Sequence, residues 1–318
     1  MNTIRNGIRP VGSPADAQLR AGAALLMMVV IWAVNFAVAK RALEEITPLA
    51  FNALRFPLAA IVVLFALRLR GPVPLPERRD AWKVLALGVL GNVVYQQLFV
   101  FGLANTRAGV ASVLLAGTPI ATTLLSALLG HERVATLVWV GVMASFAGIV
   151  LVVVSDRGGA ATGDNTLLGD VLMIGATLAW AAYTVGARSL VERYGSVEVT
   201  AWTLWIGTVG VCLIGIPAVL ATDLARIDWS IWLSIVYAGA LSIGLAYLIW
   251  YHGVRVLGST RTAAYSNLVP VLAFAVAWLW LGEVPAIWQL LGAAVILAGV
   301  ALVQVAGRRA NLLPPEGG

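Results

Sequence analysis

Side chains able to bind a small molecule occur inside the long apolar segments of this sequence, where polar groups are otherwise rare. In the segment 84–103, two amides, a phenol and a phenyl ring occupy positions i, i+3, i+4 and i+7: Asn92, Tyr95, Gln96 and Phe99. Residues at this spacing share one face of a helix. A polar side chain inside a membrane helix is costly unless it faces a partner or a cavity. This face therefore predicts one wall of a binding cavity.

Similar side chains recur in other apolar segments of the chain. They are Trp32 and Asn35, Trp180 and Tyr183, Tyr247, and Tyr265 with Asn267. Rings and amides together suit a ring-bearing or zwitterionic solute, or a flat cation held by cation–π attraction. The alternative for any one of them is helix packing, because such groups also hydrogen-bond between membrane helices. The set in segment 84–103 favours a cavity more strongly, since four positions on one face exceed what packing needs.

Arg55 lies several residues inside the apolar segment 48–67. Its guanidinium could bind the carboxylate of a substrate. It could instead pair with the carbonyl groups or dipole of a neighbouring helix, or extend to the membrane interface as long basic side chains do. The sequence leaves these alternatives open.

Groups that most enzymes and ATP-driven pumps require are missing from the sequence. The chain has two lysines, Lys40 and Lys83, and neither belongs to a phosphate-binding Gly-x-x-x-x-Gly-Lys loop. No Asp or Glu lies in the middle of an apolar segment, and the two histidines are isolated. We therefore expect neither an enzyme nor a bound metal or cofactor.

The composition indicates an integral membrane protein. Apolar residues make up 60% of the chain and charged residues only 11%, against about 25% charged in soluble domains. A helix needs roughly 20 apolar residues to cross the hydrocarbon. We predict an all-α protein with ten spans: 21–39, 48–67, 84–103, 108–129, 135–154, 168–187, 199–220, 230–252, 262–281 and 286–306.

The placement of charge predicts the orientation of these spans. The net charge of +6 comes mainly from Lys and Arg beside the N-terminus and in the loops on its side of the membrane. Basic residues are enriched in cytoplasmic loops, so we expect the tails 1–20 and 307–318 to be cytoplasmic, in a multi-pass inner (plasma) membrane protein. The same placement argues against nucleic acid as a partner. The expected partners are the bilayer and a small molecule, for a monomer or homodimer.

The second half of the sequence resembles the first. Identical residues recur 151 positions apart: Gly88 and Gly239, Gly102 and Gly253, Pro119 and Pro270, Glu132 and Glu283, Gly141 and Gly292, and Gly148 and Gly299. At a shift of 148, Trp32 matches Trp180. We predict two repeats, 21–154 and 168–306, joined by a linker at 155–167. Because five spans are an odd number, the repeats would have inverted topology, with the binding site between them.

The repeated residues carry further predictions. Pro119 and Pro270 lie within spans, where proline removes a backbone hydrogen bond, so we expect kinks that could serve as hinges. For Glu132 and Glu283 we expect a structural role, accepting hydrogen bonds at the start of the helix that follows. The repeated glycines of the fifth and tenth spans permit close helix packing. Those spans read as outer scaffolding or a dimer surface.

Several of these elements resemble a known family. Pro119 followed by Glu132, and Pro270 followed by Glu283, are similar to the pattern of the drug/metabolite transporter superfamily, in its members with two EamA repeats. The Trp32–Asn35 element and Arg55-Phe56 fit the same pattern. The resemblance implies ten helices around a central cavity. The aromatic residues make the chain most similar to the bacterial exporters of aromatic amino acids and paraquat.

Three functions are compatible with these observations. The favoured one is a facilitator or secondary exporter of small organic solutes, with aromatic or bulky amino acids as substrates, working by alternating access. The second is an exporter of other metabolites or cationic drugs with the same fold. The third is a scaffold that transports nothing or an intramembrane enzyme, which the missing catalytic groups disfavour.

Overall fold

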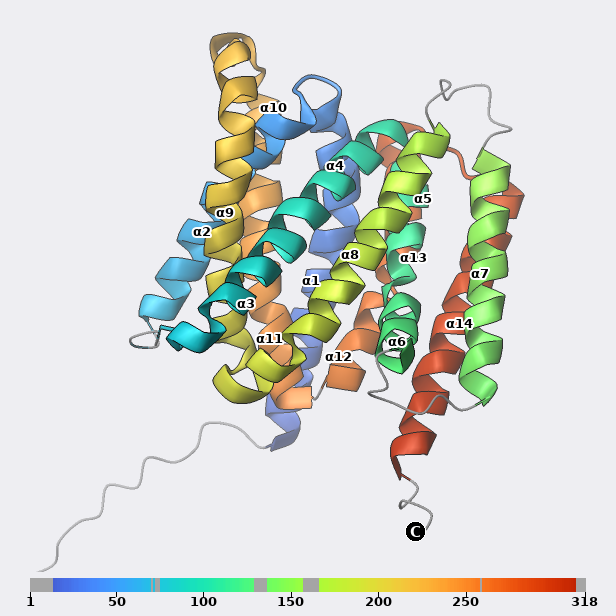
Figure 1. Ribbon diagram of the computed structural model, residues 1–318. Coiled ribbons are helices and arrows are strands. Elements are labelled where there is room, and N and C mark those ends of the chain that lie inside the picture. Colours follow the sequence, from blue (N-terminus) through green and yellow to red (C-terminus); the bar gives the residue numbers. More distant parts are fainter. Residues whose placement is uncertain are drawn as a thin grey trace, which may run out of the picture.

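The computed structural model describes residues 14–69, 71, 75–128, 136–156, 166–257 and 259–312, and every regular element in these ranges is a helix (Figure 1). The first half contains α1 (Pro14–Leu43), α2 (Pro48–Arg68), α3 (Arg78–Gly88), the π-helix η1 (Val89–Val94), α4 (Tyr95–Asn105), α5 (Ala108–Ala116), α6 (Thr118–Leu128) and α7 (Thr136–Asp156). The second half contains α8 (Thr166–Tyr194), α9 (Ser196–Ala221), the 3-10 helix η2 (Leu224–Arg226), α10 (Trp229–Val236), the π-helix η3 (Tyr237–Leu245), α11 (Ala246–Leu257), α12 (Ser259–Ser266), α13 (Val269–Leu281) and α14 (Ile287–Leu312).

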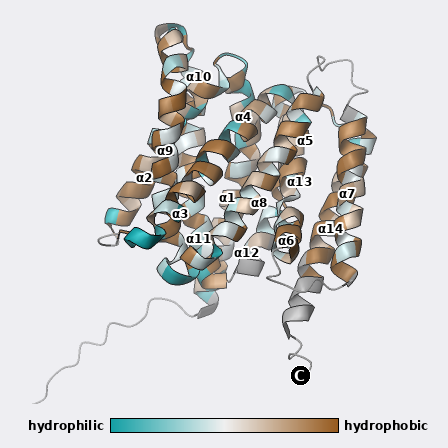
Figure 2. Ribbon diagram, in the orientation of Figure 1, coloured by the Kyte–Doolittle hydropathy of each residue, from teal (hydrophilic) through white to brown (hydrophobic). Residues whose placement is uncertain are grey.

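The helices form eight segments long and apolar enough to cross a membrane: Asp16–Leu43, Pro48–Arg68, Arg78–Asn105, Ala108–Leu128, Leu137–Ser155, Thr166–Tyr194, Ser196–Ala221 and Trp229–Leu257. Two shorter apolar helices, Val269–Leu281 and Ile287–Val303, follow them. Hydrophobic residues cover the shafts of the helices, and hydrophilic ones gather at their ends (Figure 2). The expected all-helical membrane fold is therefore confirmed, with eight full-length candidate spans in the described residues.

Both prolines of the repeat interrupt their helices. α5 ends at Ala116 and α6 begins at Thr118, so Pro119 lies in the first turn of α6. In the second half, Pro270 occupies the first turn of α13, after a break at Asn267 and Leu268. A first-turn proline costs no hydrogen bond, because that N–H has no partner within the helix. Each proline thus starts a new helical piece.

Two π-helices occupy related positions in the two halves. η1 (Val89–Val94) precedes α4, and η3 (Tyr237–Leu245) precedes α11. The ends of η1 and η3, Val94 and Leu245, are 151 positions apart, as are the repeated glycines. A π-helix hydrogen-bonds i to i+5 and occurs frequently at functional sites. It also rotates the residues that follow it relative to a regular α-helix.

The glycine stripes of α7 and α14 pack against each other within the chain. A Cβ atom on Gly141 would lie 2.7 Å from the Gly299 carbonyl oxygen, and one on Gly148 would lie 2.8 Å from the Gly292 carbonyl oxygen. Because the numbers rise along one helix and fall along the other, the two helices are antiparallel. They lie side by side at one edge of the molecule (Figure 1). The small-residue face that the sequence also allowed for a dimer therefore packs within the chain, between α7 and α14.

Reciprocal contacts extend through the rest of the bundle. Gly102 lies against Met173, and its counterpart Gly253 lies against Leu25, the counterpart of Met173. A second reciprocal set pairs Gly210 with Val93 and Gly244 with Val62. In each set, one contact between the halves is repeated by the two counterpart residues, with the roles of the halves exchanged. The two halves therefore pack with approximate two-fold symmetry.

Glu283 has a different partner from the one expected. Its carboxylate accepts hydrogen bonds from the backbone N–H groups of Ala108 (3.2 Å) and Gly109 (3.4 Å), at the start of α5. The prediction that Glu283 accepts hydrogen bonds at the start of the following helix, α14, is wrong. At that helix start, Gln289 Oε1 accepts the N–H of Ala286. Glu132 and residues 157–165 of the 155–167 linker lie outside the described residues.

Candidate functional site

Aromatic side chains from both halves meet in the middle of the bundle. Trp180 of α8 is at the centre, with ring centroids 4.8 Å from Tyr95, 5.1 Å from Tyr183 and 6.3 Å from Tyr247. The complete aromatic cluster comprises Trp32, Phe36, Tyr95, Phe99, Trp180, Tyr183, Tyr247 and Trp250. α1, α4, α8 and α11 supply these rings. The structure thus brings together the predicted aromatic residues Trp32, Tyr95, Phe99, Trp180, Tyr183 and Tyr247.

Arg55 lies beside this cluster and is almost completely buried, with 1% exposure. Its Nε donates to Asn52 Oδ1 (2.9 Å) and its Nη2 to Gln96 Oε1 (2.7 Å). The guanidinium carbon lies 4.8 Å from the Phe51 ring centroid and 5.8 Å from that of Phe99. Arg55 therefore does not extend to the membrane interface, which was one of its possible roles. Gln96 and Phe99 connect it directly to α4.

Two amides that sequence reasoning missed complete this network. Asn52 Nδ2 donates to the backbone oxygen of Gln96 (3.1 Å) and to Gln97 Oε1 (3.2 Å). Asn52 precedes Arg55 by three residues, so their shared helix face was a signal available in the sequence. Asn52 of α2 and Gln96 of α4 thus orient the guanidinium directly, and Gln97 acts on it only through Asn52.

The remaining predicted residues lie in other surroundings. Asn35 is buried at 6% exposure, and its Oδ1 has no hydrogen-bond partner in the described structure. Asn92 lies in η1 and packs against Gly207 of α9, whereas Gln96 contacts Arg55 of α2. Asn92 is thus part of a π-helix, whose hydrogen bonds depart from the 3.6-residue period that the prediction assumed.

Tyr265 and Asn267 are separate from the aromatic cluster. Tyr265 lies against Gly22 near the start of α1. Gly22 precedes Trp32 by ten residues, which corresponds to about 15 Å along a helix. Asn267 lies at the break between α12 and α13. Tyr265 therefore lies apart from the aromatic cluster, and Asn267 is part of a helix break.

The π-helix η3 contacts the cluster directly. Trp32 Nε1 donates to the carbonyl oxygen of Ser242 (2.9 Å), and the Tyr237 hydroxyl donates to the carbonyl oxygen of Ile31 (3.1 Å). In the second half, the hydroxyls of Tyr183 and Thr203 are hydrogen-bonded at 3.1 Å. Two rings of the cluster, those of Trp32 and Tyr183, are thereby oriented by hydrogen bonds.

The outer surface of α2 and α9 is hollowed. A groove of about 250 Å³ lies on the outer apolar surface and is lined by Ala60, Ile61, Leu64 and Trp205. Ala60, Ile61 and Leu64 belong to α2, and Trp205 belongs to α9. This groove is apolar, and its lining residues do not belong to the aromatic cluster.

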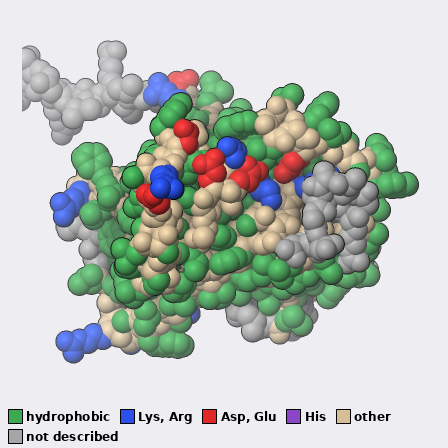
Figure 3. All heavy atoms as spheres, turned by 90° about the horizontal axis from the view of Figure 1, so that it is seen from above, with side chains coloured by type: hydrophobic (Ala, Val, Ile, Leu, Met, Phe, Trp, Pro, Cys, Tyr) green, Lys and Arg blue, Asp and Glu red, His purple; other side chains and the backbone are tan. Residues whose placement is uncertain are grey.

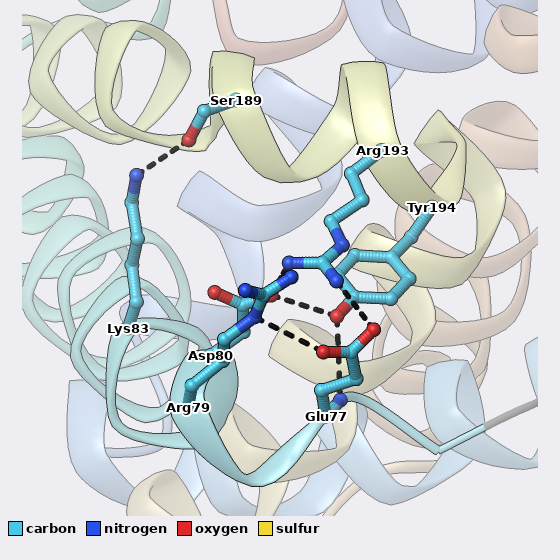
Figure 4. A network of polar contacts seen from close by, with 7 residues as sticks. All are labelled: Glu77, Arg79, Asp80, Lys83, Ser189, Arg193 and Tyr194. Atoms are coloured by element: carbon cyan, nitrogen blue, oxygen red, sulfur yellow. Dashed lines mark hydrogen bonds and ion pairs between the residues drawn. The ribbon is translucent and has the colours of Figure 1, made fainter.

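A charged network joins the start of α3 to the end of α8 (Figure 4). Both lie at the end of the molecule where α1 starts (Figure 1). Arg193 of α8 forms ion pairs with Glu77, the residue before α3, and with Asp80 in its first turn (3.0 Å). The Tyr194 hydroxyl donates to Asp80 Oδ2 (2.7 Å). Lys83 Nζ donates to Ser189 Oγ (2.6 Å). We call this set the inner latch.

At the opposite end, charges are gathered within a hydrophobic rim (Figure 3). Arg41 pairs there with Glu44 and Glu45, which lie three and four residues after it. Asp228 is the counterpart of Glu77, and its Oδ1 accepts the Ser230 N–H (2.8 Å) within its own helix, α10. This hydrogen bond lowers the pKa of Asp228. Arg41 is thus ion-paired within the first half, and its charge also attracts that of Asp228 in the second half. The inner latch differs in having ion pairs that join the two halves.

A helical membrane protein with a buried polar and aromatic site shared by two similar halves has the architecture of a membrane transporter. Its sequence places it in a particular group: the chain belongs to the EamA-like transporter family, whose sequence profile matches residues 20–154 and again 167–305. The resemblance to a superfamily with two EamA repeats is thereby confirmed. So is the expectation of a transporter and not an enzyme.

Individual relatives cover nearly the whole chain. An uncharacterized transporter, YdfC, of Bacillus subtilis (strain 168) is 28% identical over 90% of this chain and 91% of its own length. A probable terminal-alkyne amino-acid exporter of Streptantibioticus cattleyicolor is 29% identical over 92% of this chain and 96% of its own length. A solved crystal structure matches with a TM-score of 0.63 at 23% identity, over 93% of this chain and 99% of that one. That last likeness concerns the fold alone.

Proposed function

We propose that this protein carries small organic solutes, in particular aromatic or bulky amino acids, across the plasma membrane through the site between its halves. The observation that carries the proposal is the aromatic cluster beside the buried Arg55. Rings from α1 and α4 of the first half meet rings from α8 and α11 of the second. A solute bound there would contact both halves, so movement of one half relative to the other would change its access.

Ten spans in two inverted repeats are the topology that we propose. The reciprocal glycine contacts support it, because they relate the halves by approximate two-fold symmetry. The antiparallel α7 and α14 support an axis in the membrane plane, which inverted repeats require. The shorter apolar helices Val269–Leu281 and Ile287–Val303 would be parts of the ninth and tenth spans.

The orientation that we propose has both termini in the cytoplasm. The start of α1 and the end of α14 lie at the same end of the molecule (Figure 1). The basic residues Arg78, Arg79 and Lys83 also belong to this end, at the start of α3. Excess positive charge favours the cytoplasmic side. The inner latch would then close the cytoplasmic face.

Alternating access is the transport mechanism that we propose. The inner latch joins α3 to α8, which belong to different halves, so it must break when the cytoplasmic side opens. At the other end, Arg41 pairs with Glu44 and Glu45 within the first half, but Glu283 joins the second half to the start of α5. The contacts of Glu283 would therefore break when the outer side opens. The breaks before Pro119 and Pro270 offer hinges for this movement.

Amino acids are the proposed substrates, as in the exporters of aromatic amino acids and paraquat that the sequence resembles. The Streptantibioticus relative, a probable terminal-alkyne amino-acid exporter, supports this class. The test is counterflow of radiolabelled phenylalanine in proteoliposomes, with and without a proton gradient. Accumulation above empty vesicles is expected. Failure of phenylalanine, tryptophan and leucine to accumulate would refute the amino-acid proposal.

A second candidate is export of flat organic cations such as paraquat. The stacked rings around Trp180 favour it, because aromatic faces attract cations. The test is growth of an overexpressing strain with paraquat or with toxic amino-acid analogues. Protection against paraquat alone would favour this second candidate, and protection against the analogues alone would favour the first.

A further inference from the structure

The charge of Arg55 has only neutral partners. Among the described residues, its side-chain hydrogen bonds go to Asn52 and Gln96, both of which are amides, and no described ion pair includes it. A buried charge is costly unless an opposite charge compensates it. Arginine has five N–H donors, and these two bonds leave several for another acceptor. The site is therefore prepared for an anion that the described part of the chain does not provide.

Asn35 has the complementary deficiency. Its Oδ1 is a buried acceptor that no donor among the described residues reaches, although nearly all such groups in proteins are hydrogen-bonded. A ligand that donates hydrogen bonds would satisfy this oxygen. Asn35 follows Trp32 by three residues, on the helix face that contacts the aromatic cluster.

The approximate symmetry of the halves relates Asn35 to Arg55. Tyr183 and Thr203 are their counterparts, each 148 positions later. In the second half, these two side chains are directly hydrogen-bonded at 3.1 Å and complete each other. The same two positions in the first half hold a cationic donor and an acceptor without a donor. The pair is complete in one half and incomplete in the other.

We propose that Arg55 and Asn35 bind the two charged groups of an α-amino acid, and that Arg55 determines specificity for a carboxylate. This proposal rests on the proposed function and deepens it. The substrate carboxylate takes the free N–H groups of Arg55, as is favourable for guanidinium and carboxylate, and its ammonium donates to Asn35 Oδ1. The side chain of the substrate then lies among the rings of the aromatic cluster. Organic cations without a carboxylate are repelled by Arg55.

Three ligands with one phenyl ring separate these contacts. They are phenylalanine, 3-phenylpropionate, which lacks the ammonium, and phenethylamine, which lacks the carboxylate. We would measure their binding to the purified full-length protein in nanodiscs by quenching of tryptophan fluorescence. Phenylalanine should bind most tightly and phenethylamine at least tenfold more weakly. If phenethylamine bound to the unsubstituted protein as tightly as phenylalanine, the proposal would be overturned.

Substitutions assign the two contacts. Arg55→Gln should abolish the preference for carboxylates, whereas Arg55→Lys should keep it with weaker binding. Asn35→Ala should lower the affinity for phenylalanine to that for 3-phenylpropionate. Thr203→Val changes the counterpart of Arg55 and should preserve the order of the three ligands. An unchanged order in Arg55→Gln would overturn the role of Arg55.

The tests distinguish failure of the binding roles proposed for Arg55 and Asn35 from failure of the proposed function. Counterflow of phenylalanine together with equal binding of phenethylamine would overturn the carboxylate proposal and leave amino-acid transport standing. If no amino acid showed either binding or counterflow, the carboxylate proposal and the proposed function would both be overturned. Paraquat counterflow that Arg55→Gln does not change would also contradict the specificity role.

Discussion

Arg193, in the last turn of α8, is paired with Asp80, in the first turn of α3, through Nη1 and Oδ2 at 3.0 Å. The two residues are 113 positions apart and belong to different halves of the chain. Their contact is part of the inner latch, at the end where the proposed mechanism requires the halves to separate.

Arg193→Gln should open the inner end more often. Because the side chain of Arg193 is 34% exposed, each ion pair contributes only about 0–1 kcal/mol to stability, so folding should persist. The measurement is maleimide labelling of Ala187→Cys, a buried position beside the latch, in a Cys212→Ser background. Labelling from the cytoplasmic side should become several-fold faster. Arg226→Gln, which breaks a pair with Asp223 within one loop, is the control, and equal labelling rates in both variants would contradict the latch.

Gly141→Ala should destabilise the contact between α7 and α14. The added Cβ would lie 2.7 Å from the Gly299 carbonyl oxygen, so the helices must move apart, at a cost of about 1–3 kcal/mol. Thermal unfolding in detergent measures the change. Gly175→Ala is the control, because its Cβ would lie 3.6 Å from Leu98 in ordinary contact. If Gly141→Ala and Gly175→Ala had the same melting temperature, the close approach at Gly141 would not contribute to stability.

Trp180→Ala should weaken binding of aromatic substrates. Trp180 has ring contacts with Tyr95, Tyr183 and Tyr247, and each such pair contributes about 0.5–1.5 kcal/mol. Phenylalanine affinity should fall by at least about tenfold, which corresponds to about 1.4 kcal/mol, in the fluorescence measurement. Trp229→Ala removes a ring that is 70% exposed outside the cluster and should leave affinity unchanged. Equal losses in the two variants would place the substrate elsewhere.

Glu283 should make stability depend on pH. Burial raises its pKa above the ordinary 4.5, although the N–H groups of Ala108 and Gly109 and the charges of Lys40 and Arg107 oppose this shift. The folded state then binds a proton more readily than the unfolded state, so stability is lost as pH rises from 4.5 through the raised pKa. Acidification from neutral pH should therefore stabilise the native protein relative to Glu283→Gln. Melting temperatures at pH 4.5 and pH 7.5 test this, and a constant difference between the two proteins would refute it.

The sequence was sufficient for the class of protein and the relation between its halves. Apolar segments of about 20 residues are long enough to cross a bilayer, where backbone groups must be satisfied within a helix. The identities that are 151 positions apart, such as Gly141 and Gly292, identified a repeat. The aromatic members of the site were also predictable, because large rings and amides are conspicuous inside apolar helices.

Only the tertiary structure decided which side chains meet. The sequence placed Asn92 in a regular helix with Tyr95 and Gln96, whereas in the structure Asn92 belongs to the π-helix η1 and packs against Gly207 of α9. The sequence put Glu283 at the start of its own next helix, whereas packing of the halves brings it to α5. The Arg193–Asp80 pair likewise depends on how two distant helix ends are brought together. The physical reason is that apolar composition determines whether a helix crosses the membrane, but its rotation and neighbours depend on close packing with helices far away in the sequence.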